Sequence, residues 1–192
     1  PRRGETLKVA VIGLGTGTMA VHGRDGDLFR FYDIDPKIER VARKHFSYLD
    51  PNNPAKTEVI LGDARISMER ELKTEGPGNY DLIVLDAFSG DAIPAHLLTD
   101  EAFAIYDKHL RRDGGVPMGV VAIHISNRYL DLEPVVAAIA NKHGYKMMLF
   151  HTEEGFAASD TGSDWVLVTQ NQEFLNDSVV SSLGKPLAPK HE

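Results

Sequence analysis

The sequence predicts an α/β fold built on one mostly parallel, seven-stranded sheet, with helices on both faces and an antiparallel strand at one edge. Three observations support this prediction. Short apolar runs rich in β-branched residues alternate with longer amphipathic runs of helical period. The first apolar run passes directly into glycines at positions 13, 15 and 17. Acidic residues follow several apolar runs, at the strand ends where parallel sheets of this kind bind ligands.

Four strands and two helices are expected in the first half of the chain. The strands cover residues 9–12, 29–34, 57–61 and 80–86, which are short apolar runs bounded by turn-forming residues. Asp35 and Pro36 begin a helix that continues to about Leu49, because its apolar residues recur on one helical face. A less regular helix follows at residues 65–73 and is broken by the glycines and proline at 76–79.

The second half adds two helices and three strands. Thr99 caps a helix whose face carries Phe103, Tyr106 and Leu110, and the Asp-Gly-Gly run at 113–115 closes it. Residues 120–126 form the fifth strand, and Asp131 caps a helix that stops at Gly144. The last two strands, at 146–152 and 164–169, are expected to form an antiparallel pair at one sheet edge. We therefore expect one domain over residues 1–192, with its core at about 7–175 and a polar C-terminal tail at 176–192.

The composition excludes several classes of function. A net charge of -7 argues against a nucleic-acid partner and suits a cationic substrate. The chain has no cysteine, so disulfides, a thiolate nucleophile and Cys-ligated zinc are excluded, and its eight histidines lack metal-ligand spacing. It has no apolar run of membrane-spanning length and no visible signal peptide, so we expect a cytoplasmic protein. Because it opens on Pro1, we expect a piece of a longer chain.

The glycines after the first strand predict a nucleotide-type site. Such a turn uses backbone angles that a Cβ disfavours, and it lets a ligand approach the main chain closely. The spacing is G-x-G-x-G, which differs from the dinucleotide pattern G-x-G-x-x-G because position 18 is Thr. This form is found in proteins that bind S-adenosylmethionine (SAM) and its relatives.

Two carboxylates at the next strand ends fit the same ligand. Asp33 lies 16 residues after Gly17, where a carboxylate can accept both ribose hydroxyls of a nucleoside. The third strand stops at Gly62-Asp63-Ala64, where Asp63 can accept a hydrogen bond from an adenine amine while a neighbouring backbone N–H meets a ring nitrogen.

The fourth strand ends in a loop with two further acidic residues. Asp86 and Asp91 lie in the stretch Leu85-Asp86-Ala87-Phe88-Ser89-Gly90-Asp91-Ala92-Ile93-Pro94. Taken singly, Asp86 could serve as a cap and Asp91 as a turn former. Together they predict an anionic entrance to the site that would hold an amine.

From Leu7 to about Gly144 the sequence resembles spermidine synthase, of the aminopropyltransferase family. The resemblance is strongest to a bacterial branch that is often joined to a membrane transporter-like half. The stretches that carry it are Val-Ile-Gly-Leu-Gly-Thr-Gly, Tyr-Asp-Ile-Asp-Pro, Gly-Asp-Ala, Asp-Ala-Phe-Ser-Gly-Asp-Ala-Ile-Pro and Ser126-Asn127-Arg128-Tyr129-Leu130.

The resemblance implies a Rossmann-like SAM-methyltransferase/spermidine synthase fold with SAM or decarboxylated SAM as the cofactor. Asp33 would hold the ribose, Asp63 and Ala64 would hold the adenine, and the glycine turn would line the sulfonium side. The residues of that turn are Gly13, Gly15, Thr16 and Gly17. Asp86 would take the position of the amine-facing catalytic Asp, and Asp91 that of a second substrate-holding Asp before the gate-loop residues Pro94 and Ala95.

The sequence also departs from the family's pattern. Thr16 replaces an Asp that binds the aminopropyl ammonium of decarboxylated SAM in the well-known synthases. The loop between Asp86 and Pro94 is two residues longer, and the N-terminal hairpin region that contacts the polyamine is absent from the sequence. His124 lies near a family Gln, and we expect it to pack or hydrogen-bond rather than catalyse.

Three functions remain open from the sequence. The first is aminopropyl transfer to a small-molecule amine or polyamine, favoured by Asp86 and Asp91 together. A SAM-dependent methyltransferase would share the fold and the first three strand ends, although no Asn-Pro-Pro-Tyr type motif follows the fourth strand. A non-catalytic domain that binds SAM, decarboxylated SAM or methylthioadenosine is favoured by Thr16 and the missing hairpin. A homodimer is left open as the assembly.

Overall fold

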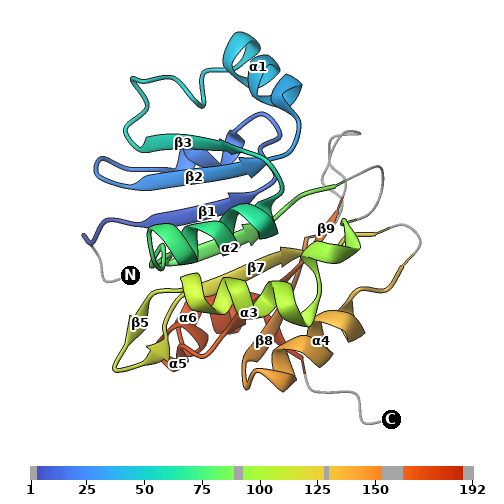
Figure 1. Ribbon diagram of the computed structural model, residues 1–192. Helices are drawn as coiled ribbons and strands as arrows, with labels where there is room; N and C mark the ends of the chain where they lie inside the picture. The colour runs from blue at the N-terminus through green and yellow to red at the C-terminus, as the bar shows by residue number, and fades with distance from the viewer. Residues whose placement is uncertain (1–3, 89–92, 128–129, 153–161, 188–192) are drawn as a thin grey trace.

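An eight-stranded sheet forms the centre of the protein, with the strand order β10-β8-β9-β7-β4-β1-β2-β3 (Figure 1). The structure is a computed structural model that describes residues 4–88, 93–127, 130–152 and 162–187. The strands of this sheet are β1 (Lys8–Ile12), β2 (Leu28–Asp33), β3 (Lys56–Leu61), β4 (Leu82–Leu85), β7 (Val120–His124), β8 (Lys146–Thr152), β9 (Ser163–Thr169) and β10 (Lys185–Pro186).

Helices connect most of these strands. The α-helices are α1 (Pro36–His45), α2 (Ala64–Thr74), α3 (Asp100–His109), α4 (Glu133–Lys142), α5 (Gln172–Leu175) and α6 (Ser178–Leu183). Two short 3₁₀ helices, η1 (Thr18–His22) and η2 (Ala95–Leu97), follow β1 and β4, and β5 (Arg112–Asp113) pairs with β6 (Val116–Pro117) in a separate small hairpin.

The seven predicted strands are all present, and β10 is an eighth. Strands β3, β2, β1, β4 and β7 pair in parallel, whereas β9 runs antiparallel to both β7 and β8. Strand β9 lies between β7 and β8, and β8 and β10, which pair antiparallel, complete the edge. This order arises because the chain crosses from β7 through α4 to β8 and leaves a gap that β9 fills.

The core has two layers, one on each face of the sheet, as a parallel sheet requires. Alternate residues of β1 face opposite layers: Val9 and Val11 pack with η1 and α1, whereas Ala10 and Ile12 pack with α2, α3 and α4. In Figure 1, α2, α3 and α4 lie in front of the sheet. This arrangement leaves the carboxyl ends of the parallel strands at one common edge.

The predicted caps of α1 and α3 are confirmed, whereas the predicted cap of α4 and two predicted helix ends are wrong. The N-cap of α4 is Leu132 rather than Asp131. Helix α3 ends at His109 because Leu110 is extended, and the run at 113–115 instead joins β5 to β6. Asp35 caps α1 by accepting a hydrogen bond from the Lys37 N–H, and Thr99 caps α3. Helix α1 ends at His45 rather than at Leu49, because Phe46 is extended. Leu49 is nevertheless buried, and it packs beside Gly17, so its apolar position reflects a loop contact instead of a helical face.

Part of the segment expected as a polar tail is folded. Asp177 caps α6, and β10 pairs with Met148 and Leu149 of β8. Leu187 packs against the larger core layer. These elements are too short to produce a recognisable periodicity in the sequence.

Candidate functional site

The predicted site residues with described positions lie along one edge of the sheet. Gly13, Gly15, Thr16 and Gly17 follow β1, Asp33 ends β2, Asp63 and Ala64 follow β3, and Asp86 follows β4. Since the sheet order is β4-β1-β2-β3, these strand ends are neighbours in space in that sequence. Asp91 lies outside the described residues.

The glycine turn touches Asp86 on one side. Gly13 has a φ of +101°, and a Cβ built there would lie 2.3 Å from the Asp86 carbonyl oxygen. The Asp86 N–H donates to the Ile12 carbonyl at 2.9 Å. A residue with a side chain would therefore clash with the main chain that carries Asp86, which explains glycine at this position.

Asp33 joins the glycine turn to the third strand end. Its Oδ2 accepts a hydrogen bond from the Leu14 N–H at 2.9 Å, and its Oδ1 accepts one from the Asp35 N–H at 2.9 Å. Its carbonyl oxygen accepts from the Gly62 N–H at 2.8 Å. The half-buried carboxylate is thus held in a fixed direction, with lone pairs left for a further donor.

Asp63 is both a helix cap and the partner of a histidine. Its Oδ1 accepts from the Ile66 N–H at 2.9 Å and so caps α2, in which buried Ala64 is the first residue. Its Oδ2 accepts from the His96 Nε2–H at 2.6 Å. The N-terminus of α2, with its unpaired N–H groups and positive dipole end, therefore points along the same edge of the sheet.

The η2 segment is held over this part of the edge. Besides the contact of His96 with Asp63, the Tyr106 hydroxyl donates to the Leu97 carbonyl at 3.0 Å, and Arg65 reaches the His96 carbonyl at 3.5 Å. Burial raises the pKa of Tyr106 well above its usual range, so this hydroxyl keeps its proton at any ordinary pH.

Asp86 forms a side-chain pair with His124. The His124 Nδ1 lies 2.8 Å from Asp86 Oδ1, and its Nε2 lies 3.0 Å from the Ser126 hydroxyl oxygen. The ring stacks on Trp165 with centroids 4.5 Å apart and meets Phe88 edge-on at 4.8 Å. His124 therefore packs and hydrogen-bonds as expected, and the residue it bonds is the predicted catalytic carboxylate.

Two features of the site were not predicted from the sequence. The contact of His96 with Asp63 joins residues 33 positions apart, and that of His124 with Asp86 joins residues 38 apart. Of the two histidines, only His124 could be anticipated near the site, because it ends an apolar strand close to the other candidate residues. Thr16 bonds the Thr18 hydroxyl at 2.6 Å, so its side chain stays within the turn.

Two negative findings apply to the described part of the chain. No group of three or more His, Asp or Glu side chains is arranged to hold a metal ion within residues 4–88, 93–127, 130–152 and 162–187. Within the same ranges, no helix is both long enough and apolar enough to cross a membrane.

Two curated proteins resemble the chain in sequence. A polyamine aminopropyltransferase of Vibrio vulnificus is 36% identical over 115 residues, covering 57% of this chain and 36% of the relative. An N-terminal histidine N-methyltransferase of Emericella nidulans is 33% identical over 118 residues, covering 59% of this chain and 20% of the relative. The chain thus spans about a third of the length of the aminopropyltransferase and about a fifth of the length of the methyltransferase. No family model matches the chain.

Solved structures resemble the whole architecture. Human methyltransferase-like protein 13 in complex with SAH has a TM-score of 0.67 at 20% identity, covering 86% of this chain and 72% of that one. A spermidine synthase in complex with the transition-state analogue AdoDATO has a TM-score of 0.62 at 16% identity, covering 85% and 54%. The protein therefore has the Rossmann-like α/β fold that methyltransferases and spermidine synthases share.

Proposed function

We propose that the protein is a transferase that binds a SAM-type nucleoside at the carboxyl edge of its sheet. In this proposal it passes the aminopropyl group of decarboxylated SAM to an amine of a small polyamine. One observation carries the proposal: Asp86, the glycine turn, Asp33 and Gly62-Asp63 form an unbroken row, each joined to the next by a hydrogen bond or a close contact. Such a row offers polar groups, in order, to the sulfur side, the ribose and the base of a thioadenosine.

The nucleoside would lie along the row with its ribose at Asp33. Each oxygen of that carboxylate accepts one backbone N–H, so each has a lone pair for a ribose hydroxyl. The adenine amine would meet Asp63, and the first backbone N–H groups of α2, including that of Ala64, would face a ring nitrogen. The turn Gly13–Gly17 would line the sulfonium side.

The amine would meet Asp86 at the other end. An alkylamine of pKa about 10 is roughly 0.1% neutral at pH 7, a deficit of about 4 kcal/mol that the reaction must overcome. The sulfonium charge favours loss of that amine's proton, and Asp86 would receive the proton and direct the nitrogen for in-line attack. Asp91 is proposed as a second partner of the amine on sequence grounds.

Methyl transfer from SAM to a nitrogen atom is the second candidate. It is favoured by the 33% identity to an N-terminal histidine N-methyltransferase and by Thr16, which offers the aminopropyl ammonium no charged partner. The two reactions share the nucleoside site and attack by nitrogen at a sulfonium carbon. They differ in the tail of the cofactor and in the acceptor.

Calorimetry with SAM, decarboxylated SAM and methylthioadenosine tests the binding site. We expect all three to bind, and Asp33→Ala to weaken each by about 1.5 to 3 kcal/mol, or roughly 10- to 150-fold, as a lost charged hydrogen-bond partner does. Asp35→Ala is the matched control, because Asp35 caps α1 two residues away. Unchanged methylthioadenosine affinity in Asp33→Ala would refute the site. Thr16→Asp should create a preference for decarboxylated SAM that the wild type lacks.

Mass spectrometry of the products then separates the reactions. Spermidine from putrescine and decarboxylated SAM supports aminopropyl transfer, and a methylated amine or histidine peptide from SAM supports the second candidate. We expect slow turnover that Thr16→Asp accelerates with decarboxylated SAM and that Asp86→Asn abolishes. Binding without any product would leave a nucleoside-binding domain and refute the transferase proposal.

A further inference from the structure

Among the described residues, the side chain of Asp86 has one hydrogen-bond partner, His124, and it is partly exposed. Its Oδ1 lies 2.8 Å from His124 Nδ1. Asp86 follows β4 and His124 ends β7, and these strands pair with Leu85 in register with Ile123. The side chain of Asp86 is 39% exposed and that of His124 is 20% exposed. One oxygen of the carboxylate is therefore hydrogen-bonded to the imidazole, while the side chain remains partly exposed to solvent at the edge of the sheet.

The imidazole itself is fixed in two directions. Trp165 stacks on the ring at 4.5 Å with an angle of 6° between the planes, and Phe88 closes on it edge-on at 79°. Rotation of the ring would break the stacking on Trp165 and both hydrogen bonds. His124 therefore presents Nδ1 to Asp86 and Nε2 to Ser126 as a rigid unit.

The carboxylate of Asp86 fixes a hydrogen on the Nδ1 atom of His124. An ionised carboxylate only accepts, so Nδ1 carries a hydrogen and donates it to Asp86. The Ser126 oxygen accepts from the Asp164 N–H at 2.7 Å and lies 3.0 Å from Nε2, so the hydroxyl is fixed beside the ring. His124 thus carries a hydrogen on Nδ1, and it is held by Ser126 on one side and holds Asp86 on the other.

We propose that His124 is the positioning residue of the transfer reaction and aims the free oxygen of Asp86 at the attacking amine. This inference rests on the proposed function. The ammonium gives one proton to Asp86 Oδ2, and the freed nitrogen lone pair forms the new N–C bond. The C–S bond breaks, its electron pair stays on sulfur, and the sulfonium becomes a neutral thioether. His124 exchanges no proton in this step; it fixes the direction of the acceptor oxygen.

Two substitutions at position 124 separate positioning from packing. His124→Asn places an amide N–H near the position of Nδ1, whereas His124→Gln reaches instead toward Ser126. We expect Gln to lower kcat about 100-fold, the effect of misplacing a reacting group by about 1 Å, with the nucleoside KM unchanged. Asn should restore most of kcat. His151→Asn is the matched control, because His151 makes the same Nδ1 contact with Asp164 outside the row, and it should leave kcat unaltered.

Nitrogen NMR of the imidazoles at pH 8 gives a readout that needs no turnover. We expect the Nδ1–H tautomer for His124 in the wild type and in Ser126→Ala, and loss of that preference in Asp86→Asn. An Nε2–H tautomer in the wild type, or equal kcat for the Asn and Gln variants, would overturn the inference. If the wild type turns over no donor, the proposed function fails, and the tautomer still decides whether His124 holds Asp86.

Discussion

Gly13 is the residue at which the fold and the candidate site constrain each other most directly. Its φ of +101° is unfavourable for any side chain, and its Cβ position falls on the Asp86 carbonyl, which is backbone and cannot rotate away. Gly15 offers a matched comparison, since its φ is +52° and nothing lies within 4 Å of its Cβ position. The two glycines of one turn thus have different reasons to be glycine.

We predict that Gly13→Ala destabilises the protein by about 2 to 4 kcal/mol, combining backbone strain with overpacking, whereas Gly15→Ala costs about 1 kcal/mol. Urea unfolding, compared at equal m-value, measures both. Gly13→Ala should also reduce transfer activity more than nucleoside affinity, because it displaces Asp86. Equal losses of stability in the two variants would show that contact with Asp86 is not the constraint.

The site residues differ in how far the sequence could predict them. Asp33, Asp63 and Asp86 follow apolar runs directly, so their common edge follows from a parallel sheet. Their partners do not follow in this way. His96 reaches Asp63 only because η2 folds back over α2, and His124 reaches Asp86 only because β7 lies next to β4. Such pairings depend on tertiary arrangement, which no local pattern contains.

At the scale of elements, a buried polar network fixes α2 to β2. The Tyr32 hydroxyl donates to Glu71 Oε2 at 2.7 Å and lies 3.0 Å from the Tyr80 hydroxyl. Arg30 lies 3.5 Å from the same Glu71 oxygen and bonds Glu58 at 2.9 Å. Because Asp33 ends β2 and Asp63 caps α2, this network also holds the two proposed nucleoside contacts relative to each other.

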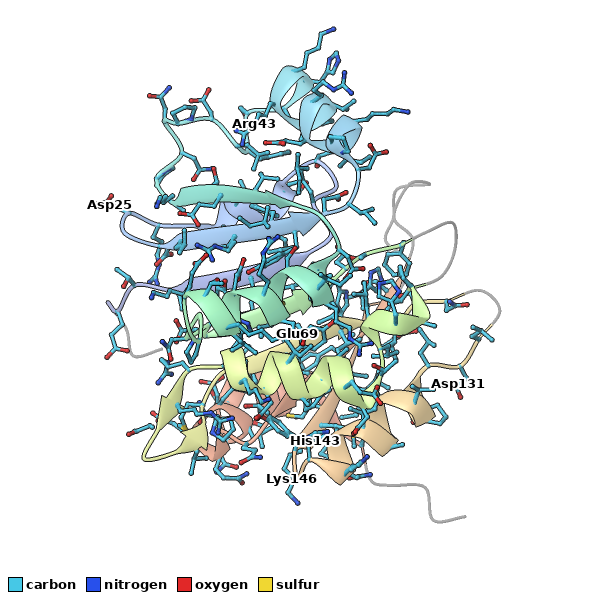
Figure 2. The ribbon with its side chains drawn as sticks, in the orientation of Figure 1. Asp25, Arg43, Glu69, Asp131, His143 and Lys146 are labelled. Carbon is cyan, nitrogen blue, oxygen red and sulfur yellow. The ribbon has the colours of Figure 1, made fainter. Side chains whose placement is uncertain are left out.

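We predict that Glu71→Ala lowers the free energy of unfolding by about 3 kcal/mol, since it removes the buried acceptor of the Tyr32 hydroxyl and one of the carboxylates beside Arg30. Glu69→Ala is the control on the same helix. Glu69 pairs with Lys73 at 2.7 Å on the exposed face, where Figure 2 shows it, and its loss should leave the urea midpoint nearly unchanged. Similar midpoints for the two variants would contradict the role assigned to the network.

Element boundaries show the limit of periodicity as a guide. The starts of α1 and α3 were predictable, because Asp35 and Thr99 are capping residues with a local mechanism. The end of α1 was not predictable, because apolar Leu49 continues the helical pattern although it contacts the glycine turn from a loop. The position of β9 inside the sheet likewise follows from chain topology, and its sequence resembles that of an edge strand equally well.

At the scale of the whole molecule, buried tyrosines set an alkaline limit to stability. Burial is the largest cause that raises the pKa values of Tyr32, Tyr80, Tyr106 and Tyr145 above their usual value of 10.0. The unfolded chain would ionise these groups near pH 10, while the folded protein keeps them protonated. Proton release therefore favours unfolding as pH rises, and the stability that is complete below about pH 10 is lost above it.

Urea unfolding between pH 8 and pH 11 tests this expectation. We predict a flat stability up to about pH 9.5 and a decline above pH 10, with each buried tyrosine contributing at most about 1.4 kcal/mol per pH unit. Tyr106→Phe should reduce the decline of the free energy of unfolding with pH by the contribution of one titrating proton. The substitution removes one buried phenol, and the hydrogen bond lost with it is the one to Leu97. Phenolate absorbance from the buried tyrosines should rise together with the loss of folded structure. If all of the phenolate formed while the protein remained folded, burial would not be holding these protons, and the alkaline limit would need another cause.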